Sequence, residues 1–352
     1  MMIREAGLYT DMGKGMIECR ACARLCKLRE GANGFCYVRR NVGGRLQLMN
    51  YGVLEAIQID PIEKKPFSHF MPGTYVFGIG TSSCNWGCQF CQNHNISKDK
   101  EIQGEYFSPE RIVGMALENN TQGIAFTYNE PTIFMEYAID VARLAHREGL
   151  ATMFVTNGYM TEEAVLAMRG NIDAAVVNIK GNAEQKFANR FEAVVSNEPI
   201  FESMAAMKRA GIHLEMTDLI IPRVGDSLEA CGALTKRVVE TLGPDVPMHF
   251  NAFHPDYKMM DYPVTDYATL KAHRDIAESN GVNYAYIGNA YGNPHENTVC
   301  PGCGGIAIGR EGFSITSWNL DAWNRCNSCG TAVLMRGTVP KSFPERRIES
   351  LL

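Results

Sequence analysis

The chain has 352 residues and a mass of 39.1 kDa, which is enough for one large domain with small additions. Hydrophobic residues make up 45% of it, and no run of about 18 uncharged apolar residues occurs, so a membrane-spanning helix is excluded. The formal net charge of −5 gives no electrostatic reason to expect nucleic-acid binding.

Cysteine is the most informative residue type in the sequence. The first residues lack the apolar core of a signal peptide, so we expect a cytoplasmic protein. Twelve cysteines in such a protein indicate metal binding rather than disulfides. Eleven of them fall into three groups, whereas Cys231 stands alone in a helical pattern and is predicted to be a small core residue.

Residues 1–50 are predicted to form a small lobe that carries the first cysteine group. Its spacing is CxxCxxxC, followed by a glycine-containing turn and one more cysteine, and its members are Cys19, Cys22, Cys26 and Cys36. Four thiolates so close in sequence can close a tetrahedral zinc site or hold a second iron–sulfur cluster. The spacing does not separate these two interpretations, and free structural thiols are a third.

Residues 51–73 include DPIEKKPFSHFMPG, in which two prolines and a Pro-Gly pair predict an ordered linker rather than a helix. Lys64 and Lys65 in this linker can contact an anionic substrate, although paired lysines in a loop are commonly solvated.

Residues 74–295 alternate apolar strand-like runs with amphipathic helices and are predicted to form the main domain. The runs are YVFGIG, GIAFTY, ATMFVTN, AAVVNIK, HLEMTDLII, MHFNAF and YAYIG. Ser108 and Thr161 are predicted helix N-caps, and two helical segments end at glycine. This alternation predicts βαβ units and an α/β fold with a parallel sheet, either doubly wound or a partial barrel.

The stretch TSSCNWGCQFCQN, residues 81–93, follows the first of these strands and carries Cys84, Cys88 and Cys91. Clusters of the [4Fe–4S] type are normally held by four thiolates, so three thiolates leave one iron open for a substrate or cofactor. A zinc knuckle, a disulfide or buried free thiols are the alternatives. Zinc usually takes paired CxxC knuckles and fits this spacing poorly.

Residues 296–352 contain two CxxC knuckles, each followed by glycine, with short strand-like runs between them. This pattern predicts a zinc ribbon, and its ligands would be Cys300, Cys303, Cys326 and Cys329. Rubredoxin-like iron is the alternative, because it prefers the same tetrahedron of sulfurs.

The spacing CxxxCx(aromatic)C, in which Phe90 is the aromatic residue, resembles the signature of the radical S-adenosylmethionine (SAM) superfamily. The resemblance implies that the open iron chelates the amino and carboxylate groups of SAM. An electron from the cluster then cleaves the sulfonium C–S bond, and the 5′-deoxyadenosyl radical abstracts a hydrogen atom. The resemblance also implies a partial TIM-like (β/α)6 barrel, in which active-site residues lie at the carboxyl ends of the strands.

The same resemblance implies roles for residues at the ends of three strands. TYNEP looks like a variant of the GGEP-like motif that binds the SAM amino group, which gives this role to Glu130, although a glutamate can also stabilise a helix N-terminus there. Thr156 and Asn157 can hydrogen-bond the methionine carboxylate or the ribose, or form a turn. Lys180 fits an aspartate–x–lysine pattern of glycyl-radical activating enzymes, with Asn178 in place of the aspartate.

Two later strands add further candidates. His213, Glu215 and Thr217 alternate along one strand and are predicted to share a face, toward SAM or as a packed polar layer. We expect Thr217 to contact the cofactor. His249 matches a histidine of the activating-enzyme family and is also expected at the cofactor, while His254 is predicted to face the opposite side of its strand.

A closer resemblance runs nearly from end to end. DPIEKKP, GIGTSSCNWGCQFCQN, TYNEP, FHPDYKM, YIGN and the terminal CPGCG…CNSCG together look like the AmmeMemoRadiSam-system radical SAM proteins, relatives of pyruvate formate-lyase activating enzyme. It implies an electron donor such as ferredoxin or flavodoxin, partners of the Memo and AMMECR types, and a polypeptide substrate. A small metabolite or RNA is the alternative substrate. A non-catalytic iron–sulfur scaffold or electron carrier is the alternative of another class.

Overall fold

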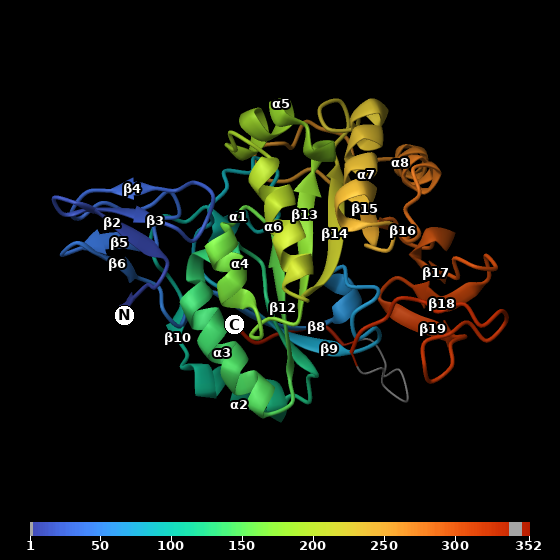
Figure 1. Cartoon of the computed structure of the whole chain (residues 1–352), viewed down its shortest axis with the longest axis horizontal. Coiled ribbons are helices and arrows are strands. Elements are labelled where there is room, and N and C mark those ends of the chain that lie inside the picture. The colour runs from blue at the N-terminus through green and yellow to red at the C-terminus, as the bar shows by residue number, and fades with distance from the viewer. Residues whose placement is uncertain (1–2, 338–346) are drawn as a thin grey trace.

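The computed structural model describes residues 3–337 and 347–352, and a nine-stranded sheet forms its centre (Figure 1). The strand order is β16-β15-β14-β13-β12-β11-β9-β8-β20. The parallel strands follow one another in chain order and match the seven predicted runs: β9 (Tyr75–Gly80), β11 (Gly123–Phe126), β12 (Ala151–Thr156), β13 (Ala174–Lys180), β14 (His213–Ile220), β15 (Met248–Ala252) and β16 (Ala285–Gly288).

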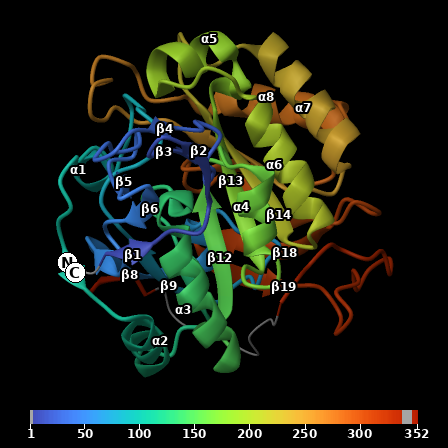
Figure 2. The same ribbon diagram turned by 60° about the vertical axis from the view of Figure 1, so that its left-hand side comes forward.

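One main helix lies between each pair of consecutive parallel strands. These helices are α2 (Pro109–Glu118), α3 (Met135–Arg147), α4 (Glu162–Met168), α6 (Glu198–Arg209), α7 (Leu228–Leu242) and α8 (Tyr267–Ser279). Ser108 caps α2 and Thr161 caps α4, each by accepting a hydrogen bond from a backbone N–H of the first turn. Figures 1 and 2 show α3, α4 and α6 side by side along one face of the sheet. The predicted α/β class with a parallel sheet is confirmed.

The antiparallel edge of the sheet differs from the prediction. β8 (Ala56–Pro61) pairs with β9, and β20 (Glu349–Ser350) pairs with β8. The predicted linker at residues 51–73 is therefore partly a strand, because Ile57 and Ile59 alternate into the core and are both fully buried. The sheet ends at β16 on one side and at β20 on the other. Sequential strand order agrees with a partial barrel, whose curvature stays a prediction.

The N-terminal lobe consists of two small antiparallel sheets, beside a strand pair formed with the main domain (Figure 1). The first sheet contains β1 (Arg4–Glu5), β5 (Arg39–Val42) and β6 (Arg45–Leu48), and the second contains β2 (Tyr9–Gly13), β3 (Met16–Cys19) and β4 (Lys27–Leu28). β7 (Val53–Leu54) pairs with β10 (Glu105–Tyr106). Cys22 forms a backbone bridge with Met160, so the lobe lies against the carboxyl end of β12.

The C-terminal lobe is a three-stranded antiparallel sheet of β17 (Thr298–Val299), β18 (Ile306–Glu311) and β19 (Ser314–Trp318). Residues 338–346 of the predicted C-terminal lobe lie outside the described residues. The short helices α1 (His94–Ser97) and α5 (Gln185–Phe187) complete the fold. Within residues 3–337 and 347–352, no helix has the length and apolar character needed to cross a bilayer.

Candidate functional site

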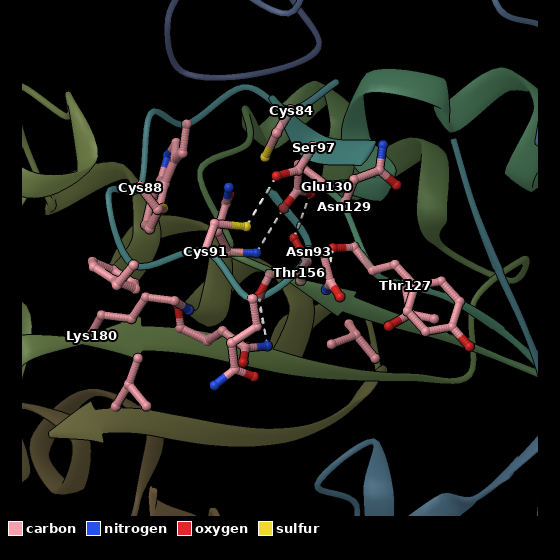
Figure 3. Close-up of a pocket in the computed structure, with 18 of the residues that line it drawn as sticks. Cys84, Cys88, Cys91, Asn93, Ser97, Thr127, Asn129, Glu130, Thr156 and Lys180 are labelled. Atoms are coloured by element: carbon pink, nitrogen blue, oxygen red, sulfur yellow. Dashed lines mark hydrogen bonds between the residues drawn. The ribbon is translucent and has the colours of Figure 1, made fainter. Parts of the chain in front are cut away.

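A cavity of about 250 Å³ lies at the carboxyl ends of the parallel strands, where the loop that follows β9 folds over them (Figure 3). It brings together nine residues that the sequence singled out: Cys84, Cys88, Phe90, Cys91, Glu130, Thr156, Asn157, Lys180 and Thr217. These residues come from the cysteine loop and from the ends of four strands. Because parallel strands end at one edge, the fold collects residues that lie far apart in sequence.

The three cysteines of the loop lie near a half-buried cation, Lys98. The Lys98 ammonium follows α1, lines the cavity and donates a hydrogen bond to the Trp86 carbonyl oxygen over 3.0 Å. Burial lowers the pKa of Lys98, but the three nearby thiols outweigh this and raise it overall. Burial also raises the pKa values of the Cys84 and Cys88 thiols, and Lys98 opposes this effect. Lys98 therefore favours the thiolate form at both sulfurs, although the net pKa of each thiol stays above its usual value.

Glu130 is buried at the start of the turn Pro131–Phe134, with 2% of its surface exposed. Its Oε1 accepts hydrogen bonds from the Thr132 N–H, the Thr132 hydroxyl (2.6 Å) and the Thr156 hydroxyl (2.7 Å). Its Oε2 accepts one from the Asn157 N–H over 2.7 Å. Burial raises the pKa of Glu130, and these hydrogen bonds oppose the rise. The carboxylate thus joins β11 to β12, and Oε2 keeps one acceptor position free.

Polar side chains on β12, β13 and β14 form the next part of the wall. The Thr217 hydroxyl donates to Asn178 Oδ1 over 3.0 Å, and the Lys180 ammonium donates to the Asn178 carbonyl oxygen over 3.3 Å. Asn157 Nδ2 donates to Asn85 Oδ1 over 2.8 Å, which ties the end of β12 to the cysteine loop. Lys180 retains two N–H groups for an anionic ligand, because an ammonium carries three donors.

His249, which we expected at the cofactor, does not line this cavity. Its Nε2 is 3.0 Å from Glu215 Oε2, and its ring stacks on Tyr286 below the cavity. Asn251, two residues further along the same face of β15, lines the cavity instead. His249 was assigned from the family resemblance, and it lies two residues nearer the amino end of β15 than Asn251, on the same face.

His213 and Glu215 likewise form a packed polar layer and do not line the cavity. The Glu215 carboxylate accepts hydrogen bonds from His213 Nε2 (3.0 Å), His249 Nε2, and the backbone N–H groups of Ser68 and His69. Burial would raise the pKa of Glu215, but the two histidines hold it well below the usual range. Of the three residues predicted to share this face of β14, only Thr217 reaches the cavity.

Several residues that line the cavity were not assigned a site role from the sequence, although Asn178 and residues 127–129 of the TYNEP motif were named there. They are Trp86, Gln92, Asn93, Ser97, Lys98, Thr127, Tyr128, Asn129, Val155, Asn178, Leu219, Asn251 and Asn289. The Ser97 hydroxyl lies 3.0 Å from the Cys91 sulfur. A short polar helix directly after the cysteine loop was the available signal for Ser97 and Lys98. Asn251 was identifiable from its strand-end position, since it alternates with His249.

The other two cysteine groups lie in the outer lobes. The sulfurs of Cys300, Cys303, Cys326 and Cys329 all lie within 4.8 Å of one another, with pairs at 3.6 and 3.8 Å. A tetrahedral zinc ion with bonds of about 2.3 Å places its sulfurs about 3.8 Å apart, so this group fits one metal ion. The N-terminal group, Cys19, Cys22, Cys26 and Cys36, lines a separate cavity. All twelve cysteines are free thiols, as expected for metal ligands rather than disulfides.

Comparison with known proteins identifies the class. Residues 79–232 match the model of the radical SAM superfamily, and this range contains the cysteine loop and most of the cavity wall. The chain therefore carries a radical SAM domain, which implies a [4Fe–4S] cluster and SAM and supports an enzyme. It belongs to the same family as the uncharacterized protein MJ0808 of Methanocaldococcus jannaschii, which is 38% identical over 334 residues, covering 94% of this chain and 99% of the relative.

More distant relatives and solved structures are also similar. The uncharacterized protein MJ0674 of the same organism is 21% identical over 303 residues. The match covers 79% of this chain and 80% of that protein. A radical SAM methyltransferase from Sphaerobacter thermophilus has a TM-score of 0.49 and 15% identity, covering 61% of this chain and 66% of that chain. A domain of pyruvate-formate lyase-activating enzyme from Bacteroides vulgatus has a TM-score of 0.40 and 17% identity. The match covers 47% of this chain and 99% of that domain.

Proposed function

We propose that this protein is a radical SAM enzyme whose [4Fe–4S] cluster is held by Cys84, Cys88 and Cys91 and reductively cleaves SAM. The observation that carries the proposal is the shared cavity, in which three thiols from one loop face polar groups from the ends of four strands. When bound, the cluster would supply the electron that breaks the sulfonium C–S bond. Three protein ligands leave one iron for the amino and carboxylate groups of SAM.

The residues of the cavity fit a zwitterionic ligand beside such a cluster. Glu130 Oε2 has an acceptor position for an ammonium group, and Lys180 has donors for a carboxylate. Lys98 offsets the negative charge of the thiolates. Trp86 and Phe90 are almost fully buried, and they exclude water from the apolar part of the wall. We assign Thr156, Asn157 and Thr217 to positioning the ligand.

We further propose a polypeptide as the hydrogen donor to the radical. This choice follows from the motifs shared with activating enzymes and with the AmmeMemoRadiSam-system proteins, which also make Memo-type and AMMECR-type proteins candidate partners. A ferredoxin or flavodoxin of the cytoplasm would supply the electron. The C-terminal group of four cysteines would hold structural zinc, because its sulfur distances match one tetrahedral ion.

The test is reductive SAM cleavage under anaerobic conditions. Reconstituted protein, dithionite and SAM should yield 5′-deoxyadenosine, measured by chromatography. Cys84→Ala, Cys88→Ala and Cys91→Ala should each abolish the product, because each removes one ligand of the cluster. Cys231→Ala is the matched control, since this buried thiol lies in α7 away from the cavity, and it should retain activity.

Cleavage at the normal rate in any one of the three loop variants would contradict the proposal. Wild-type protein with full iron content and no nucleoside, even with candidate polypeptides added, would favour the iron–sulfur scaffold instead.

A further inference from the structure

The four N-terminal cysteines converge on one cavity between the N-terminal lobe and the main domain. Cys19, Cys22, Cys26 and Cys36 line it together with Arg39 from the same lobe. The remaining wall includes Asn85, Thr132 and Ile133, which belong to the main domain. Three of the four cysteines have less than a tenth of their surface exposed. Such a buried group of thiols, enclosed by two parts of the fold, has the arrangement of a metal site.

The spacing of the sulfurs distinguishes this group from the C-terminal one. Among the described residues, only the C-terminal four form a set of three or more metal-ligating atoms that all lie within 4.8 Å of one another. The N-terminal thiols are therefore more widely spread than a single zinc ion requires, which is about 3.8 Å between sulfurs. The three thiols of the Cys84 loop are likewise not all within this limit. A cluster of several metal ions separates its ligating sulfurs further than a single ion does.

A glycine keeps the space between two of these thiols open. A Cβ atom built on Gly34 would lie 3.7 Å from the Cys36 sulfur and 3.8 Å from the Cys26 sulfur. A β-carbon at this position would make ordinary van der Waals contact with both sulfurs, so glycine leaves this side of the two thiols uncovered.

The cavity also holds a hydrogen-bond donor without a partner. Asn85 is fully buried, and its Nδ2 has no hydrogen-bond partner among the described residues, although its Oδ1 is bonded to Asn157. A buried amide N–H without an acceptor lowers the stability of the fold unless a ligand accepts its hydrogen bond. The sulfides and thiolates of an iron–sulfur cluster are such acceptors, and hydrogen bonds to them tune the cluster. The buried Arg39 guanidinium lies on the same wall and is paired with Glu136, whose carboxylate offsets its charge.

The N-terminal cavity and the cofactor cavity share a thin wall. Cys84 lines the cofactor cavity and Asn85, the next residue, lines the N-terminal one, so consecutive residues of one loop border both cavities. A second connection runs through aromatic rings. The ring of Trp86 lies 6.1 Å from that of Tyr159, and the Tyr159 carbonyl oxygen accepts a hydrogen bond from the Ala23 N–H.

We propose that Cys19, Cys22, Cys26 and Cys36 hold a second [4Fe–4S] cluster that passes electrons to the cluster at Cys84. The site itself follows from the geometry above, whereas the transfer rests on the proposed function. Each transfer moves one electron and no atoms. A low-potential one-electron donor protein reduces the N-terminal cluster, which is reoxidised when it reduces the cluster at Cys84.

Metal content and electron paramagnetic resonance (EPR) test the site. Anaerobically reconstituted wild-type protein should hold about eight irons, and Cys19→Ala with Cys36→Ala should hold about four. The triple variant of Cys84, Cys88 and Cys91 to alanine should also keep about four irons. After dithionite reduction its EPR signal should not change when SAM is added, whereas the signal of the N-terminal variant should. Cys231→Ala is the control and should keep all its iron.

About four irons in the wild type, with a zinc ion lost from the N-terminal double variant, would overturn the proposal in favour of zinc. Asn85→Ala gives an independent readout. Loss of an N–H donor disfavours the reduced, more negative cluster, so the potential of the SAM-insensitive signal should become more negative. An unchanged potential would overturn the assigned hydrogen bond.

Electron transfer is tested by freeze-quench EPR after excess reductant has been removed. SAM added to the reduced wild type should bleach both signals while 5′-deoxyadenosine forms. A persistent N-terminal signal beside 5′-deoxyadenosine would overturn the transfer but leave the cluster. Eight irons without any 5′-deoxyadenosine would instead contradict the proposed function, and the N-terminal cluster would stand.

Discussion

Glu130 shows how one residue can have a structural and a ligand-binding role at once. Its carboxylate accepts four hydrogen bonds from Thr132, Thr156 and Asn157, so it holds two strand ends in register. Only Oε2 keeps an acceptor position. Substitution therefore has two separable effects: lost hydrogen bonds lower stability, and the lost negative charge weakens attraction for an ammonium group.

We expect Glu130→Gln to weaken SAM binding by about tenfold to a hundredfold, because a hydrogen bond to a charged group contributes about 1.5–3 kcal/mol. Iron content should not change, since Glu130 is not a thiolate ligand. Anaerobic calorimetry on the oxidised, reconstituted protein measures the affinity. Thr132→Val is the matched control: it removes one hydrogen bond to the same carboxylate, so it should lower the melting temperature and leave SAM affinity nearly unchanged. Equal affinity for the wild type and Glu130→Gln would remove the assigned role.

Glu192 is a second buried carboxyl group, and its expected effect is on pH dependence. Burial raises its pKa from 4.5 to about 8, although Lys180 opposes the shift, and its Oε1 has no partner in the described part of the chain. Between these two values the folded protein keeps a proton that the unfolded chain releases. The free energy of unfolding should therefore fall as pH rises, by on the order of 4 kcal/mol.

Glu192→Gln should remove this slope, so its melting temperature should exceed that of the wild type at pH 8 and differ less at pH 5. Calorimetric unfolding across this range measures the effect. The exposed Glu240, changed to Gln, is the control and should leave the slope in place. A parallel pH dependence of Glu192→Gln and wild type would show that Glu192 is ionised in the folded state.

At the scale of elements, the sequence predicted the parallel strands well and the ends of the sheet less well. Continuous apolar runs and capped helices are local signals, so they could be recognised in the sequence without tertiary information. β8 was missed, because its alternating run leads directly into a proline-rich segment. Position along a strand is not a local signal either: the resemblance that pointed to His249 did not indicate that Asn251 would line the cavity.

The cysteine groups could also be recognised in the sequence, because the spacing of metal ligands along the chain is itself a local signal. What spacing cannot give is the distance between sulfurs, and this distinguishes the C-terminal four from the N-terminal four. Partners from distant segments were also out of reach. Asn85 and Arg39 both line the N-terminal cavity, and nothing in either local sequence pairs them.

The C-terminal lobe should lose one metal equivalent on its own. Cys300→Ala with Cys329→Ala should release about one zinc ion, because it removes two of four ligands. Visible iron–sulfur absorption should remain, since the lobe lies across the sheet from the Cys84 loop (Figure 1). The melting temperature should fall, because Cys300 and Cys326 are buried against Tyr284 and Tyr286 in a small core of their own. Metal analysis and absorption spectra measure both effects, and loss of the absorption would indicate iron in this lobe instead.

At the scale of the whole molecule, the polar layer under the cavity joins the sheet to the C-terminal lobe. Glu215 accepts hydrogen bonds from the backbone of Ser68 and His69. The same two residues contact the C-terminal lobe, where Arg310 donates to the Ser68 carbonyl oxygen over 2.7 Å and the Leu334 carbonyl oxygen contacts His69 Nδ1. A buried charged residue at the centre of the sheet is thus surrounded by groups from three separate parts of the chain.

These contacts also affect the order in which parts of the protein can fold during synthesis. Ser68 and Arg310 are 242 residues apart, and His69 and Leu334 are 265 apart. The loop that carries Ser68 and His69 emerges first, and its partners are synthesised 242 residues or more later. These hydrogen bonds to Ser68 and His69 can form only after all the parallel strands have been synthesised, so we expect the contacts beneath the sheet to complete late in folding.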